Sequence, residues 1–178
     1  TSGADAVKFQ TFLAQDLVVR GAPTAAYQQQ QTGQTDQFFM LEKLELSHDM
    51  HLRIQAHCQA IGIEFFSTPF SVAAVEMLVG LGVKRLKLSS GELTHKALVA
   101  HAAATQLPLL VSTGMASMTE INEALSWIWE ARGNLEQVVC LHCTSSYPAL
   151  DGSLHLRAIE AMQRDLPVPI GYSDHSTG

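Results

Sequence analysis

Two lysines stand in the middle of short apolar segments that are typical of β-strands, a position where lysine is rarely found without a partner. They are Lys8 in "AVKFQ" and Lys87 in "RLKLS". Side chains alternate between the two faces of a strand, so Lys8 shares a face with Gln10, and Lys87 shares one with Arg85 and Ser89. Two ammonium groups beside serine hydroxyls and glycine amides form a cradle for a doubly charged anion such as phosphate.

An internal ion pair is the alternative explanation for these lysines, with Lys87 and Glu92 as its partners. Such a pair would hold the segment together without binding a ligand. The same arrangement recurs on two independent strands, which favours the anion site over the ion pair.

The last apolar segment ends in "GYSDHS", which places Ser173, Asp174 and His175 next to one another. A neutral imidazole is a common ligand of divalent metals, so His175 is a candidate metal ligand, although a single histidine is more often structural. A hydrolase triad is excluded, because adjacent residues on a strand point to opposite sides. The sequence also lacks the G-x-S-x-G motif of a nucleophile elbow.

The chain has three cysteines, Cys58, Cys140 and Cys143, an odd and low number that suits a reducing cytoplasm. The "CLHC" stretch at 140–143 has the spacing of a zinc or redox motif, but it lies in a predicted strand. Cys140 and Cys143 should therefore point to opposite faces, and no second C-x-x-C pair exists to complete a tetrahedral site. We interpret all three as structural cysteines.

Six apolar, β-branched segments end in small polar residues and are expected to be strands. They are residues 5–11, 63–70, 83–92, 107–115, 137–148 and 168–176. Helical patterns with capping residues lie between most of them. These start and stop signals are Ser47 with Gly62, Ser71, Thr94, Ser117 with Glu120 and Gly133, and Pro167 after a predicted helix at residues 153–165.

Strands that alternate with helices predict a parallel sheet, either doubly wound or closed into a (β/α)₈ barrel. A dinucleotide-binding doubly wound sheet needs G-x-G-x-x-G after its first strand, and this chain has none. Five of the strands end in serine-bearing polar residues. Barrel enzymes collect their chemistry at the carboxyl ends of all strands, so the pattern favours a TIM-type barrel.

Residues 12–46 interrupt this rhythm with a glutamine tract, Gln28–Gln31, followed by an amphipathic stretch. We interpret this segment as a long, partly helical excursion after the first strand. A lid over the substrate is the alternative.

The overall composition narrows the possible partners. The chain has 178 residues, is 47% hydrophobic and carries a formal net charge of −6, which argues against nucleic acid or an anionic membrane as a partner. It contains no apolar run long enough for a transmembrane helix, and its first residues do not resemble a signal peptide. Together with the low cysteine count, these features lead us to expect a cytoplasmic protein.

Six motifs, in order from residue 3 to residue 178, resemble the sialic acid synthase family (N-acetylneuraminate synthase and its relatives). They are "GADAVKFQTF", "FFSTPF", "KLSSGE", "VSTGM", "LHCTSSYP" and "GYSDHS". The resemblance implies a (β/α)₈ barrel that condenses phosphoenolpyruvate with an N-acetylated hexosamine such as N-acetylmannosamine. The products would be a nonulosonic acid and phosphate.

The resemblance also assigns residues to phosphoenolpyruvate. The two lysines and the serine before the glycine in "KLSSGE" match its ligands, with further hydroxyls lining the same site. These residues are Lys8, Lys87, Ser90, Ser112 and Ser173, with Thr68 beside them.

Other residues match the sugar and the metal. Glu92 matches a carboxylate near the reacting sugar carbonyl, and Gln10 and Tyr147 match sugar-side positions. Ser145 stands where some members of the family have asparagine. His175 matches one of two histidines that bind a divalent metal, Mn²⁺ or Mg²⁺.

The implied chemistry is consistent with these residues. The sugar aldehyde is polarised by the metal, the enol carbon of phosphoenolpyruvate attacks it, and water adds to the resulting oxocarbenium carbon. The tetrahedral intermediate then expels phosphate. Lys8 and Lys87 would offset the phosphate charge throughout, while Glu92 orients the sugar or moves a proton.

The resemblance implies that residues 1–178 correspond to strands two to seven of eight. We therefore expect the chain to be a fragment that lacks the first strand, the eighth strand with the second metal histidine, and the C-terminal antifreeze-like domain. That domain lends an arginine to the partner subunit's site, so we expect a homodimer at full length. The fragment alone is expected to be inactive or nearly so.

Three other functions compete with a sialic acid synthase. The nearest is a sister synthase that makes legionaminic, pseudaminic or spore-coat sugar acids. Another phosphoenolpyruvate-condensing barrel, of the kind that makes 3-deoxy sugar acids, is more distant. The last is a non-catalytic barrel fragment that keeps the phosphate cradle without turnover.

Overall fold

The computed structural model describes residues 3–25, 28–29 and 33–177. All six predicted strands are present, and each pairs in parallel with the next. The strands are β1 (Ala6–Thr11), β2 (Glu64–Pro69), β3 (Leu86–Leu88), β4 (Leu109–Ser112), β5 (Val138–Cys143) and β6 (Ile170–Ser173).

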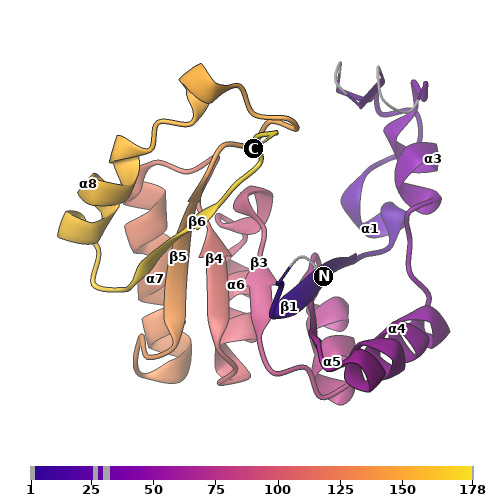
Figure 1. The fold of residues 1–178 in the computed structure, drawn as a ribbon, viewed down its shortest axis with the longest axis horizontal. Coiled ribbons are helices and arrows are strands. Elements are labelled where there is room, and N and C mark those ends of the chain that lie inside the picture. The colour runs from indigo at the N-terminus through magenta and orange to yellow at the C-terminus, as the bar shows by residue number, and fades with distance from the viewer. Residues whose placement is uncertain (1–2, 26–27, 30–32, 178) are drawn as a thin grey trace.

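The strand order β1-β2-β3-β4-β5-β6 follows the sequence. A doubly wound sheet is excluded, because its strand order reverses at a switch point. The order is that of a barrel, but a barrel closes only when its first and last strands pair. Over the described residues β1 and β6 are the two edges of an open sheet (Figure 1), so this chain does not form the closed barrel by itself.

Helices connect the strands, and α6 and α7 lie together behind β4 and β5 in Figure 1. The helices are α1 (Ala14–Leu17), α3 (Gln37–Glu42), α4 (His48–Ile61), α5 (Val72–Gly80), α6 (Lys96–Ala104), α7 (Met118–Arg132) and α8 (Arg157–Asp165). Within the described ranges, no helix combines the length and the hydrophobicity that crossing a membrane requires.

Three of the predicted helix starts are confirmed by their caps. The hydroxyls of Ser47, Ser71 and Ser117 each accept a hydrogen bond from the backbone N–H three residues later. Ser117 and Glu120 form the reciprocal capping box. Gly62 ends α4 with a φ of 75°, in the left-handed region that glycine adopts without steric cost.

The predicted start of α6 is wrong by one residue. The helix begins at Lys96 with His95 as its N-cap, rather than with Thr94 as the cap. A short 3₁₀ turn at Ser90–Glu92 precedes it, and the His95 N–H donates to the Glu92 carbonyl oxygen at 3.0 Å, so Thr94 lies inside the turn that connects the two helices.

The helix predicted at residues 153–165 is shorter than expected and begins only at Arg157. His155 has a φ of 46°, which takes the backbone out of the right-handed helical region. The predicted end is confirmed, since α8 ends at Asp165 and the residue before Pro167 is extended.

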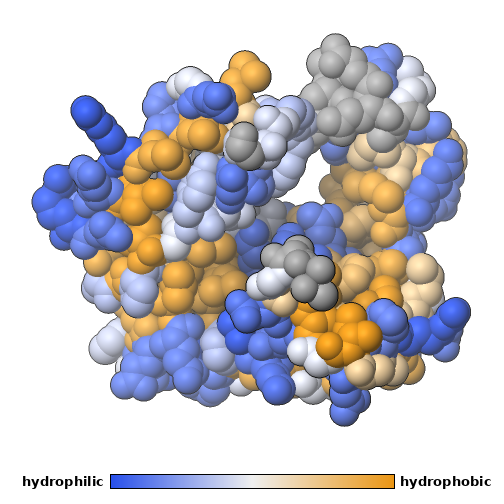
Figure 2. Space-filling model, in the orientation of Figure 1, coloured by the Kyte–Doolittle hydropathy of each residue, from blue (hydrophilic) through white to orange (hydrophobic). Residues whose placement is uncertain are grey.

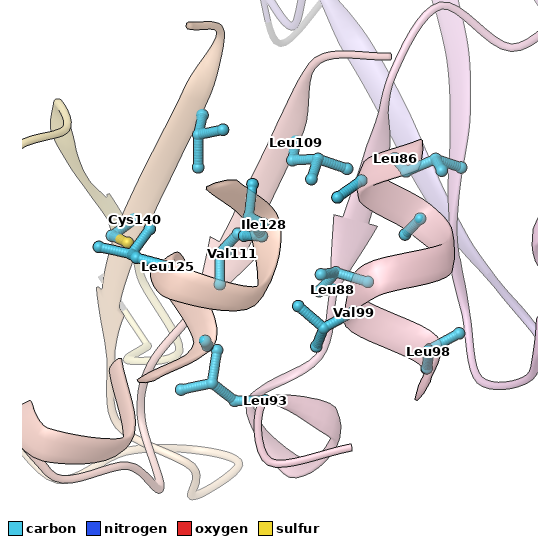
Figure 3. Close-up of a cluster of buried hydrophobic side chains, with 14 of the residues drawn as sticks. Leu86, Leu88, Leu93, Leu98, Val99, Leu109, Val111, Leu125, Ile128 and Cys140 are labelled. Atoms are coloured by element: carbon cyan, nitrogen blue, oxygen red, sulfur yellow. The ribbon is translucent and has the colours of Figure 1, made fainter. Parts of the chain in front are cut away.

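The core lies between the sheet and its helices, as Figure 3 shows for β3, β4, β5, α6 and α7. Leu86 and Leu88 are fully buried there, and Lys87 between them points to the other face. The same alternation buries Cys140 in the core, as the sequence predicts. Burial of these apolar side chains therefore decides which side chains lie on the opposite face of the sheet, away from the helices.

The predicted helical excursion at residues 12–46 contains α1 and α3, and both rise beyond the carboxyl end of β1 (Figure 1). The Asp36 carboxylate accepts from the backbone N–H groups of Phe38 and Gly21, at 2.8 and 3.1 Å. The guanidinium of Arg20 lies 4.4 Å from the centre of the Phe38 ring. Within the glutamine tract, residues 30 and 31 lie outside the described residues.

A buried chain of hydrogen bonds joins β1, β2 and α4. The Thr11 hydroxyl lies 2.8 Å from His51 Nε2 and 2.7 Å from the Ser67 hydroxyl, and all three residues are buried. His51 Nδ1 lies 2.9 Å from the Ser47 carbonyl oxygen, which can only accept. The proton is therefore on Nδ1, Nε2 accepts from Thr11, and Thr11 accepts from Ser67.

Replacing Thr11 with valine should lower the free energy of unfolding by about 2 kcal/mol, because the buried Nε2 of His51 and the Ser67 hydroxyl lose their partner. Valine keeps the shape of threonine, so packing changes little. Urea unfolding would measure the loss. The control is Thr119→Val on the exposed face of α7, which should shift stability by less than about 0.5 kcal/mol. Equal losses of stability in the two variants would show that the hydrogen bonds among Thr11, His51 and Ser67 contribute nothing to the free energy of unfolding.

Candidate active site

A cavity of about 340 Å³ opens at the carboxyl ends of the strands. Figure 2 shows hydrophilic residues at the bottom of the opening between the part of the chain that contains α3 and the segments that follow β5. The cavity is lined by Lys8, Gln10, Thr68, Lys87, Ser89, Ser90, Gly91, Ser112, Met115, Cys143, Ser145, Tyr147 and His175. A larger groove of about 680 Å³, beside β1 and α4, has a mainly apolar lining and lacks this convergence of polar groups.

All of the site residues predicted from the sequence line this cavity except Glu92 and Ser173. Ser173 lies directly behind it, with its hydroxyl 3.4 Å from Lys87 Nζ and 3.3 Å from His175 Nε2. The Glu92 carboxylate instead lies 3.1 Å from the ring of His95. The structure therefore brings the lysines, hydroxyls and histidine together and places the Glu92 carboxylate apart from them.

Four lining residues were missed by the sequence analysis as site residues. They are Ser89, Gly91, Met115 and Cys143. Two of them carried a usable signal, because Ser89 lies on the face of Lys87 and Cys143 lies on the face opposite the buried Cys140. Met115 follows β4 in a loop, where strand periodicity gives no guide to direction.

Lys8 and Lys87 both line this cavity, and among the described residues neither has a salt bridge to a carboxylate. The Lys87–Glu92 ion pair considered as an alternative is not formed, since Glu92 contacts His95. Burial lowers the pKa of Lys8, and burial together with the positive charge of Lys8 lowers the pKa of Lys87. Lys87 is the more buried of the two lysines, so the lowering of the pKa matters most for Lys87. A site with two unneutralised cations attracts an anion.

Two hydroxyls in the cavity wall have no hydrogen-bond partner. Thr68 Oγ1 and Ser112 Oγ are buried, in residues that are 2% and 3% exposed, and neither makes a hydrogen bond within the described protein. Buried polar atoms are almost always paired, so an orphan usually marks a missing ligand or water. Both hydroxyls can donate to the oxygens of an anion held by the lysines.

The ends of β3, β4 and β5 meet closely at the side of the cavity. The Ser90 hydroxyl accepts from the Gly114 N–H at 3.0 Å and lies 3.2 Å from Cys143 Sγ. A Cβ at position 114 would lie 2.7 Å from both the carbonyl oxygen and the sulfur of Cys143, and 2.8 Å from the Ser145 hydroxyl. Glycine at 114 is therefore what allows the three strand ends to approach.

His175 is held in one orientation beside the cavity. Its Nδ1 lies 2.7 Å from the Thr144 carbonyl oxygen, so Nδ1 carries the proton and Nε2 is left as the basic nitrogen. The Tyr147 ring packs on the imidazole, with ring centres 4.3 Å apart. A carbonyl partner on Nδ1 is typical of histidines that bind metals through Nε2, so the residue fits the role of one metal ligand. Across the described residues, no three His, Cys, Asp or Glu side chains lie close enough to hold a metal.

Comparison with known proteins gives relatives along the whole chain. The NeuB family matches residues 1–178. The chain is 42% identical over 180 residues to the N,N'-diacetyllegionaminic acid synthase of Legionella pneumophila, covering 99% of this chain and 51% of that protein. It is 31% identical over 178 residues to the N-acetylneuraminate-9-phosphate synthase of Homo sapiens, covering 99% of this chain and 48% of that protein.

The fold also has solved relatives. The N-acetylneuraminic acid (sialic acid) synthetase of Leptospira borgpetersenii is similar with a TM-score of 0.81 and 32% identity, covering 98% of this chain and 56% of that one. A truncated 3-deoxy-D-arabino-heptulosonate 7-phosphate synthase of Thermotoga maritima has a TM-score of 0.60 and 12% identity, a likeness of fold alone. The chain spans about half the length of the curated relatives it matches.

Rising pH should weaken anion binding earlier than at an ordinary lysine site. The lowered pKa of Lys87 means that its ammonium loses the proton at a lower pH than the usual value of 10.5. The unfolded chain keeps that proton to higher pH, so the buried charge costs stability at neutral pH, and this cost disappears as pH rises through the folded-state pKa. Calorimetric titration with phosphoenolpyruvate across the alkaline range would measure the fall in affinity.

The matched variant for this pH profile is Lys87→Arg, because a guanidinium stays charged throughout the range. The part of the alkaline fall that is due to Lys87 should move to higher pH in this variant. A profile identical to that of the unsubstituted protein would show that another group governs anion binding.

Ser112→Ala should separate stability from binding. Removing an unpaired buried hydroxyl should leave the ligand-free protein as stable as before or up to about 1 kcal/mol more stable. The affinity for phosphoenolpyruvate should fall about tenfold, because one donor to the anion is lost. Thermal unfolding with and without phosphoenolpyruvate measures both effects. Ser126→Ala on α7 is the control and should change neither; a clear loss of stability in Ser112→Ala would mean that the hydroxyl already has a partner.

Proposed function

Because the chain belongs to the NeuB family, we propose that it forms the anion-binding part of a synthase that condenses phosphoenolpyruvate with an N-acetylated hexosamine. The resemblance to sialic acid synthases noted in the sequence is thereby confirmed at the level of the family. The observation that carries the proposal is the cavity itself, where two unneutralised lysines and two unpaired hydroxyls converge at the carboxyl ends of the strands.

The six strands are, on this proposal, six consecutive strands of an eight-stranded barrel. Their sequential parallel order and the position of the site at their carboxyl ends both support it. Strands contributed by the rest of the whole protein would pair with the open edges of β1 and β6 and complete the wall of the cavity.

The lysines and hydroxyls would hold phosphoenolpyruvate. Lys8 and Lys87 offset its negative charge, while Thr68, Ser90 and Ser112 donate hydrogen bonds to its oxygens. The methylene carbon C3 of phosphoenolpyruvate forms the new C–C bond to the sugar carbonyl carbon, and the former carbonyl oxygen takes up a proton. Water adds to C2, the carbon that bears the phosphate, and loses a proton, and the C2–O bond to phosphate then breaks to leave the keto group. The phosphate that leaves stays beside the same two ammonium groups, which stabilise the charge that develops on it.

The sugar side of the cavity would consist of Gln10, Ser145 and Tyr147, which lie along its lining. Glu92 is proposed on the resemblance alone to orient the sugar or to move a proton, since its carboxylate contacts His95. A bound divalent metal would polarise the sugar carbonyl, and His175 is the residue of this chain that would hold it through Nε2.

The sugar has two candidates. N-Acetylmannosamine is the substrate implied by the motif resemblance. A diacetamido sugar is favoured by identity, because two N,N'-diacetyllegionaminic acid synthases are 42% and 36% identical to the chain, against 32% and 31% for the N-acetylneuraminate-9-phosphate synthases of Mus musculus and Homo sapiens.

Phosphate release by the whole protein that contains residues 1–178 tests the proposal. With phosphoenolpyruvate and Mn²⁺, release should require a sugar, and the comparison of N-acetylmannosamine with a diacetamido or 4,6-dideoxy analogue should identify it. Lys87→Ala should lower kcat/KM at least about 100-fold without unfolding the protein, because the phosphate loses a charge partner. Lys84→Ala, at an exposed lysine just before β3, is the matched control. No release with any of the sugars would favour the non-catalytic alternative.

A further inference from the structure

Cys143 lies at the side of the cavity, although its strand position led us to interpret it as a structural cysteine. It is the last residue of β5, is 4% exposed, and its sulfur lies 3.2 Å from the Ser90 hydroxyl oxygen. The backbone N–H of Gly114 donates to the same oxygen at 3.0 Å. Ser90 Oγ is thus the meeting point of two groups from neighbouring strand ends.

The hydrogen-bonding capacity of Ser90 decides what this contact does. A serine hydroxyl has one proton and can accept two hydrogen bonds. The Gly114 N–H occupies one acceptor position. If the Cys143 thiol donates to the other, the Ser90 proton is free to point into the cavity. If Ser90 instead donates to the sulfur, the hydroxyl offers the cavity only a lone pair.

The surroundings favour the first arrangement. The cavity contains two cationic side chains, Lys8 and Lys87, and the unpaired buried hydroxyls of Thr68 and Ser112, so its ligand is an anion that needs donors. A lone pair of Ser90 directed at an anion would repel it. A thiol is a weak donor, but Cys143 is 4% exposed and its sulfur lies 3.2 Å from the Ser90 oxygen, so the thiol is held where it can donate.

We propose that Cys143 is a positioning residue whose thiol donates to the Ser90 oxygen and thereby directs the Ser90 hydroxyl proton to the bound anion. This inference rests on the proposed anion site and adds to it a residue that acts through another. Cys143 does not touch the ligand as a nucleophile, and no bond to sulfur forms or breaks.

Cys140 provides a control within the same strand. It is fully buried in the apolar core, three residues away and on the opposite face. Burial raises the pKa of its thiol to about 12. A purely structural cysteine should tolerate alanine better than serine, because serine brings a hydroxyl into an apolar site. A cysteine that acts as a donor should tolerate serine better than alanine.

The test compares four variants of the whole protein, Cys143→Ala, Cys143→Ser, Cys140→Ala and Cys140→Ser. Calorimetry with phosphoenolpyruvate should show affinity reduced about five- to tenfold in Cys143→Ala and restored to within about twofold in Cys143→Ser. The KM for phosphoenolpyruvate should rise in parallel while kcat changes little. Both Cys140 variants should bind normally, with the serine variant melting at the lower temperature.

A double-variant cycle with Ser90→Ala links the effect to its proposed route. Once the Ser90 hydroxyl is absent, Cys143→Ala should cause no further loss of affinity. Equal affinities in Cys143→Ala and Cys143→Ser, or an undiminished effect of Cys143→Ala in the Ser90→Ala background, would overturn the positioning role alone. Failure of the unsubstituted protein to bind phosphoenolpyruvate would overturn the proposed function, and this inference with it.

Discussion

The ammonium groups of Lys8 and Lys87 lie in one cavity because the apolar side chains beside them in the strands are buried against the helices. Leu86 and Leu88 are fully buried against the helices, and the strand pleat leaves Lys87 no direction but the cavity. Val7 and Phe9 pack on the core side of β1 and direct Lys8 in the same way. The hydrophobic effect thus holds like charges together that would separate if the backbone were free, and burial lowers the pKa of both lysines as a result.

Stability and binding capacity are opposed at the strand ends. The cavity wall contains unpaired hydroxyls at Thr68 and Ser112, and a glycine at 114 that gives up side-chain packing for close approach. Away from the cavity, polar groups are paired in the capping box that begins α7 and in the hydrogen bonds that join Thr11, His51 and Ser67. This contrast is characteristic of functional sites, where groups are left available for a ligand.

Most of the fold could be predicted from local patterns, and the exceptions have physical causes. Strand alternation and serine caps depend on neighbouring residues, so the strands and the starts of α4, α5 and α7 were predicted correctly. The start of α8 was not, because a left-handed backbone at His155 leaves no compositional signal. The positions of Lys8 and Lys87 in the cavity lining followed from the alternation of side chains along a strand. The position of the Glu92 carboxylate did not, because it contacts His95. The hydrogen bonds among Thr11, His51 and Ser67 join residues distant in sequence, and such pairings are set by tertiary structure alone.

Each strand end contributes one or a few side chains to the cavity, in the order of the sequence. The lysines belong to β1 and β3, while Ser145 and Tyr147 belong to the loop after β5. The two lysines and this loop therefore lie in separate stretches of the sequence, although both open into one cavity. The loop can change by mutation while the two lysines are kept. A cavity built in this way can acquire a new second ligand and keep the same anion site.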